Sequence, residues 1–186
     1  HRYSSAASDV YKRQFLVMAV TTPIMGRLGD SHGHRKIFLI GAVLLGLGTL
    51  ACALAPSAWA FVAARMLVGL AISATMPTGM ALIMAAHPLE QRGEAMGWFQ
   101  MTMTGAPVLA LVAGGPLIEA FGWRSVFAGL LPLAIIGTTA SWRTLRKSGG
   151  DSDVPIDWTG AATLALGTLG FLLFLEFGGR LSLIHI

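Results

Sequence analysis

The chain has 186 residues, of which 54% are apolar and 12% are charged, and its formal net charge is +4. Soluble domains carry about a quarter charged residues, so this composition excludes an ordinary soluble globular domain. The positive charge does not predict a nucleic-acid partner, because basic residues also collect in the cytoplasmic loops of membrane proteins.

The apolar residues fall into long runs, which predict an all-α polytopic membrane helix bundle. Residues 1–14 are polar, and we expect them to be a non-native leader; residues 181–186 are expected to be a non-native tail. We expect transmembrane helices within 15–147, followed at 148–180 by a cytoplasmic connector and one more helix. The predicted spans are a partial one at 15–25 and full ones at 37–55, 59–86, 95–118, 126–142 and 158–177.

A charged, glycine-rich segment at 26–36 separates the first two apolar runs. Charges and glycines are costly in hydrocarbon, so we expect this segment to form a surface hinge between two spanning helices. Asp30 is expected to pair with a basic neighbour, Arg92 among them, or to cap a helix start. The segment predicts a latch that is broken and remade during transport, and the alternative is a loop that only sets topology.

Alternating loops place most basic side chains on the same side as this hinge, which predicts that the hinge faces the cytoplasm. Seven basic residues fall on the hinge side: Arg27, Arg35, Lys36, Arg92, Arg143, Arg146 and Lys147. Two fall on the opposite side, Arg124 and Arg180.

One arginine, Arg65, lies inside an apolar run. An arginine within a membrane span is a functional candidate by default, because its charge is costly there. The alternative is that its side chain reaches the interface and packs along its aliphatic stem.

The hinge matches the signature loop of the major facilitator superfamily, which joins the second and third helices of that fold. His34 stands where arginine is common. The matching residues are Gly26, Leu28, Gly29, Asp30, Gly33, Arg35 and Lys36.

Three further segments carry the same resemblance. Arg65 and Gly69 resemble the fourth-helix motif, and Gly114–Gly115 resembles the end of the fifth helix. The short connector before the last span is similar to that of the fourteen-helix drug:proton antiporters. The chain therefore resembles helices two to seven of such a transporter, and 15–147 would hold helices two to six.

The resemblance implies proton-coupled export of small amphipathic compounds across the bacterial inner membrane, by alternating access. Its implied partners are the lipid bilayer, a small-molecule substrate and protons. Asp30 and Arg35 would serve the latch and Arg65 with Gly69 the proton coupling. Gly114 and Gly115, together with Pro107, would form a bend in the fifth helix.

The antiporter motif departs from its usual form, because Ala110 and Leu111 stand where glycine and proline are expected. This departure favours the alternative of a symporter or uniporter that takes up an organic acid or nutrient. A non-transporting membrane scaffold is the more remote alternative. We expect no enzymatic activity and no cofactor, because the sequence has no enzyme signature. We expect no metal site either, since His32 and His34 do not share a helix face.

Overall fold

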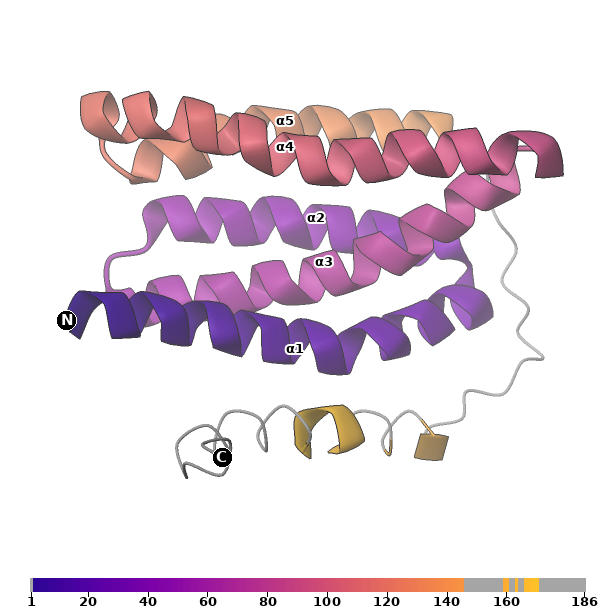
Figure 1. Ribbon diagram of the computed structural model, residues 1–186, viewed down its shortest axis with the longest axis horizontal. Helices are drawn as coiled ribbons and strands as arrows, with labels where there is room; N and C mark the ends of the chain where they lie inside the picture. Colours follow the sequence, from indigo (N-terminus) through magenta and orange to yellow (C-terminus); the bar gives the residue numbers. More distant parts are fainter. Residues whose placement is uncertain (1, 146–158, 161–162, 164–165, 171–186) are drawn as a thin grey trace, which may run out of the picture.

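The computed structural model describes residues 2–145, 159–160, 163 and 166–170, and those residues form an all-α structure (Figure 1). The predicted fold class is therefore confirmed. The elements are α1 (Arg2–His32), α2 (His34–Leu54), α3 (Ala58–Ala86), the short 3-10 helix η1 (Leu89–Gln91), α4 (Arg92–Phe121) and α5 (Arg124–Thr144).

Four stretches of the described chain are long and apolar enough to cross a membrane: α2, α3, Leu89–Phe121 and α5. They coincide with the four full spans predicted between 37 and 142. The 21 residues of α2 extend about 31 Å, which matches the hydrocarbon core of a bilayer. The predicted connector and most of the predicted last span lie outside the described residues, although 166–170 are helical.

The predicted hinge is much shorter than expected. Helix α1 continues through it to His32 and α2 begins at His34, so Gly33 alone separates the two helices. Gly33 has φ 92° and ψ 125°, a conformation that glycine adopts without a Cβ penalty. An eleven-residue loop would leave many backbone groups unpaired, whereas this turn keeps nearly all of them within helices. The predicted partial span at 15–25 likewise belongs to the 31-residue helix α1.

Helix α3 packs on both α1 and α2, and α2 also packs on α5. In Figure 1, α4 and α5 form a layer above α1, α2 and α3. The buried core consists mainly of small residues, including Cys52, Ala64 and Ala71. Small side chains let membrane helices approach closely, and dispersion contacts then hold the bundle together.

Successive helices run in opposite directions, so the bundle has two distinct ends (Figure 1). The Gly33 end contains the α1–α2 turn, the start of α4 and the end of α5. The Ser57 end contains the α2–α3 and α4–α5 connections. The described members of the predicted grouping lie at the expected ends, with Arg124 at the Ser57 end, whereas Arg146, Lys147 and Arg180 lie outside the described residues. Five lie at the Gly33 end: Arg27, Arg35, Lys36, Arg92 and Arg143.

Candidate functional site

The signature segment forms a compact junction between α1, α2 and α3 at the Gly33 end. An added Cβ on Gly29 would lie 2.7 Å from His34 Nδ1 and 2.9 Å from Thr78 Cγ2. An added Cβ on Gly26 would lie 3.8 Å from Pro77 Cβ of α3. Gly29 therefore allows this close junction, whereas a Cβ at Gly26 would make an ordinary contact. Leu28 is half-buried and Lys36 is exposed.

Asp30 pairs across the turn with His34. The Asp30 Oδ1 to His34 Nε2 distance is 3.4 Å, and the Asp30 side chain is 52% exposed. The contact is an ion pair only while the imidazole is protonated. The sequence predicted a basic partner for Asp30, and the structure identifies it as His34; Arg92 instead donates from Nε to the carbonyl of His87 at 3.2 Å.

Arg35 connects the signature segment to α5. Its Nη2 donates a hydrogen bond of 2.8 Å to the carbonyl of Trp142, in the last turn of α5. The last carbonyls of a helix lack intrahelical partners and carry the negative end of the helix dipole. Arg35 therefore caps α5 and ties it to the start of α2.

At the Ser57 end, an arginine of α5 in turn caps the end of α2. Arg124, at the start of α5, donates from Nη2 to the carbonyl of Ala55 at 2.8 Å, and Ala55 is the C-cap residue of α2. Its guanidinium carbon also lies 4.4 Å from the centroid of the Trp123 ring. Helices α2 and α5 are thus joined at both ends, each through an arginine of one and a terminal carbonyl of the other.

Arg65 lies about 10 Å along α3 from the Ser57 end and is half-buried. Its guanidinium carbon is 5.6 Å from the Phe61 ring centroid and 5.5 Å from that of Phe127. Such distances are within the range of cation–π attraction. Arg65 is therefore inside a candidate span, as predicted, and two aromatic rings contact it.

Gly69, one turn further along α3, lies against α1. Its added Cβ would be 3.2 Å from Gln14 Cγ and 3.6 Å from Met18 Cγ. One turn beyond, the buried hydroxyl of Ser73 lies 2.7 Å from Thr21 Oγ1 and donates to the Gly69 carbonyl at 3.0 Å. Small and hydroxyl side chains thus form the α1–α3 contact.

The residues predicted for the fifth-helix bend all lie in α4, away from the other candidates. Neither Gly114 nor Gly115 has an atom within 4 Å of an added Cβ, and Pro107 is inside the same continuous helix. A cavity of about 320 Å³ opens beside α4 and is lined by residues of α2, α3, α4 and α5, with Met76 and Met103 among them. The bend itself stays a prediction.

Sequence reasoning missed the aromatic residues around Arg65 and the Thr21–Ser73 contact. Phe61 was detectable, because it lies one helical turn before Arg65. Phe127 was not, since its approach depends on how α5 packs against α3. The described residues contain no group of three or more metal-ligating side chains.

The sequence profile of the Major Facilitator Superfamily matches residues 5–182. Multidrug resistance protein 3 of Bacillus subtilis is 27% identical over 158 residues, which are 85% of this chain and 31% of that protein. The Multidrug export protein EmrB of Haemophilus influenzae is 28% identical over 163 residues, 86% of this chain and 32% of its own length. The Fatty acid resistance protein FarB of Neisseria gonorrhoeae is 27% identical over 165 residues, which are 88% of this chain and 32% of that protein. The chain spans about a third of each of these relatives.

Proposed function

This chain belongs to the Major Facilitator Superfamily, and from that premise we propose that the full-length protein exports small amphipathic compounds in exchange for protons. It is a multi-pass membrane transporter related to multidrug efflux proteins and not an enzyme. Because the chain spans only about a third of those relatives, the proposal concerns the complete gene product.

The direction and the substrate class are supported by the relatives' names. Two of the three are named for multidrug resistance or export, and the third for resistance to fatty acids, which are amphipathic. All three come from bacteria, which supports a bacterial inner-membrane location. The cluster of basic residues supports a cytoplasmic position for the Gly33 end.

The proton-coupling part of the proposal depends on the position of Arg65 inside a candidate membrane span. The guanidinium of Arg65 is half-buried inside a membrane helix and carries a positive charge. Such a charge would favour the ionised form of a carboxyl group brought close to it during transport, so a proton that binds that carboxyl would weaken its attraction to Arg65. The proton gradient would therefore change how tightly the helices are held together.

The junction at the Gly33 end is proposed to act as the cytoplasmic latch. The carboxylate of Asp30 is half-exposed, so it can also contact the half of the transporter that this chain does not contain. Arg35 fixes the junction to α5, so that the latch moves together with the α2–α5 pair. Gly29 lets α1 lie close against Thr78 of α3, which favours movement of the junction as one unit.

The test is transport by the complete gene product in proteoliposomes, with ethidium as the probe. We expect an imposed pH gradient to drive ethidium against its own gradient, and collapse of the pH gradient to abolish this movement. Arg65→Gln should lose the response to the pH gradient, whereas Arg65→Lys should retain part of it. Ethidium flux that is unchanged when the gradient collapses would rule out proton coupling.

One observation favours a second candidate function, uptake of an organic acid or nutrient. Ala110 and Leu111 replace the glycine and proline expected of antiporters in α4. A symporter would move its substrate in the same direction as the protons. The same proteoliposomes separate the two functions, because lactate uptake driven by the gradient, without ethidium movement, would support the symporter.

A further inference from the structure

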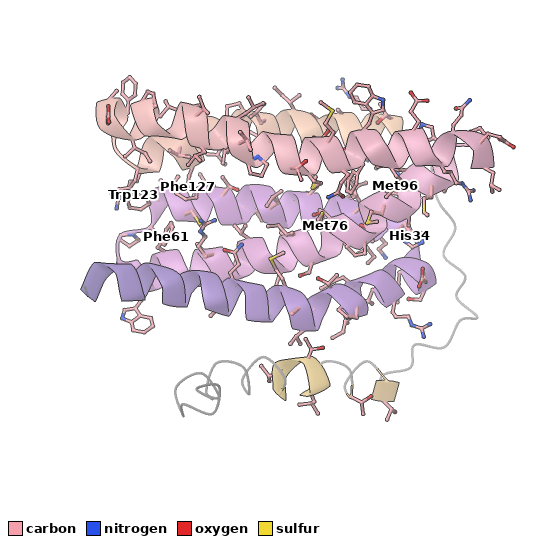
Figure 2. The ribbon with its side chains drawn as sticks, viewed as in Figure 1. His34, Phe61, Met76, Met96, Trp123 and Phe127 are labelled. Atoms are coloured by element: carbon pink, nitrogen blue, oxygen red, sulfur yellow. The ribbon has the colours of Figure 1, made fainter. Side chains whose placement is uncertain are left out.

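Three aromatic side chains form a cluster between α3 and α5 near the Ser57 end (Figure 2). Phe61 belongs to α3 and Phe127 to the first turn of α5, and Trp123 is the residue just before α5. Their ring centroids lie 5.4, 5.6 and 6.1 Å apart, and each pair meets edge to face. This is a favourable geometry for aromatic rings, so the cluster, which we name the aromatic bracket, fixes α5 against α3 at this end.

An arginine lies against each side of the aromatic bracket. Arg65 contacts the rings of Phe61 and Phe127, and Arg124 contacts the ring of Trp123. Arg124 also holds the terminal carbonyl of α2. A continuous series of contacts therefore runs from the end of α2, through the aromatic bracket, to Arg65.

The aromatic bracket holds Arg65 in a way that suits a residue whose charge must act on other groups. A ring face attracts a guanidinium through its quadrupole and uses none of its five N–H donors. The same two rings also pack against the buried cluster of Cys52, Ala64 and Val68.

We propose that Phe61 and Phe127 are positioning residues for Arg65, and that Trp123 and Arg124 fix this arrangement to the Ser57 end of α2. The proposal rests on the proposed role of Arg65 in proton coupling. It makes the position of Arg65 depend on the contact between α3 and α5. Movement of α5 away from α3 at the Ser57 end withdraws a ring from the guanidinium and changes how Arg65 acts on a proton-binding group.

The first experiment measures the position of Arg65 directly and needs no transport. In the complete gene product, the rate at which phenylglyoxal modifies Arg65 is followed by mass spectrometry. Phe61→Leu and Phe127→Leu keep apolar volume but remove the ring, and we expect each to raise the rate about threefold or more. Phe61→Tyr should keep the slow rate. Phe121→Leu is the matched control, because Phe121 lies at the same end and is 75% exposed.

The second experiment measures coupling by a double-mutant cycle in proteoliposomes. Phe61→Leu should lower the maximal gradient-driven ethidium flux about tenfold with little change in KM, and should shift its pH profile. In an Arg65→Gln background, which has already lost the gradient response, Phe61→Leu should leave the rate of ethidium counterflow unchanged, whereas a purely structural role would lower it.

The outcomes separate this inference from the proposed function. Faster Arg65 modification without any proton-coupled transport would contradict the proposed function and leave the placement of Arg65 by the rings intact. Proton-coupled transport with an unchanged modification rate, or a lower rate of ethidium counterflow from Phe61→Leu in the Arg65→Gln background, would overturn the inference.

Discussion

At the scale of single residues, the glycines of α2 decide how closely α3 can approach. An added Cβ on Gly41 would lie 2.8 Å from Thr75 Cγ2, 2.9 Å from Ala74 Cβ and 3.1 Å from the Ala71 carbonyl oxygen. One of these neighbours is backbone, which cannot move without shifting α3. Close packing at this position therefore requires the absence of a side chain.

We expect Gly41→Ala to lower the free energy of unfolding of the chain by about 1–3 kcal/mol, because it overpacks the α2–α3 contact. Gly46→Ala on the same helix is the control, since its Cβ would meet only Ala134 Cβ at an ordinary 3.9 Å. Both values can be measured by titrating the detergent-solubilised chain with sodium dodecyl sulfate and following helicity. Equal stability of the two variants would contradict the packing account.

The same scale shows why sequence reasoning identified candidate residues better than their partners. Asp30 and Arg65 were found because a charge beside or inside an apolar run is unusual wherever the chain folds. Their partners depend on geometry. The Asp30–His34 contact requires the turn to shrink to Gly33, and the Arg35–Trp142 contact joins residues 107 positions apart.

At the scale of elements, α2 and α5 form an antiparallel pair with reciprocal caps. Arg35 closes the end of α5 and Arg124 closes the end of α2. Each cap satisfies a terminal carbonyl and opposes the negative end of a helix dipole. The pair is therefore held at both ends of the bundle, which favours its movement as one body.

Removal of either cap should weaken the pair. We expect Arg35→Gln and Arg124→Gln each to lower the free energy of unfolding by about 1 kcal/mol, because a hydrogen bond from a charged donor is lost. The two sites are about 30 Å apart along α2, so the effects should add in the double variant.

Arg27→Gln is the control for these two variants, because Arg27 is exposed and its substitution removes the same charge. The measurement is the same detergent titration. An Arg35→Gln effect no larger than that of Arg27→Gln would show that the cap contributes nothing to the pair.

The helices themselves were predictable, and one turn was not. A membrane helix satisfies its own backbone, so apolar run length predicts each span almost independently of its neighbours. The segment at 26–36 is different, because its charges and glycines suit either a loop or helix ends at a membrane surface. In the structure this segment forms helix ends, because the positive φ of Gly33 lets the chain reverse at a single residue.

At the scale of the whole molecule, the sidedness of the charges predicts how the bundle sits in the membrane. We expect the Gly33 end to face the cytoplasm. In a Cys52→Ala background, His32→Cys and Ala58→Cys place single thiols at exposed positions at the two ends. A membrane-impermeant maleimide should label Ala58→Cys in intact bacteria and His32→Cys only in inverted membrane vesicles. The reverse pattern would invert the topology and remove the argument for a cytoplasmic latch.

The layer formed by α4 and α5 has the least complete packing in the described part of the chain. Gly114 is its only buried residue, whereas α3 contains eight buried positions. The cavity between α2, α3, α4 and α5 is lined by apolar side chains together with Thr75, Thr138 and Ser141. Hydroxyl groups lining a cavity favour a protein helix over lipid tails, because helices offer hydrogen-bonding partners. We therefore predict that another helix of the full-length transporter, the first of the fold, fills this cavity.

A photoactivated carbene that partitions into lipid tests this prediction by labelling accessible side chains, which mass spectrometry then locates. Met103 and Leu133 line the cavity, and Leu133 is 65% exposed in this chain. Both should be labelled in the isolated chain in nanodiscs and protected in the complete gene product. Leu50 at the α2 surface does not line the cavity but lies in a neighbouring groove with Ile135, and it is the comparison for general accessibility. Equal labelling of Met103 and Leu133 in the two proteins would mean that lipid, rather than a helix, occupies the cavity, and that the α4–α5 layer reaches its final packing without the first helix.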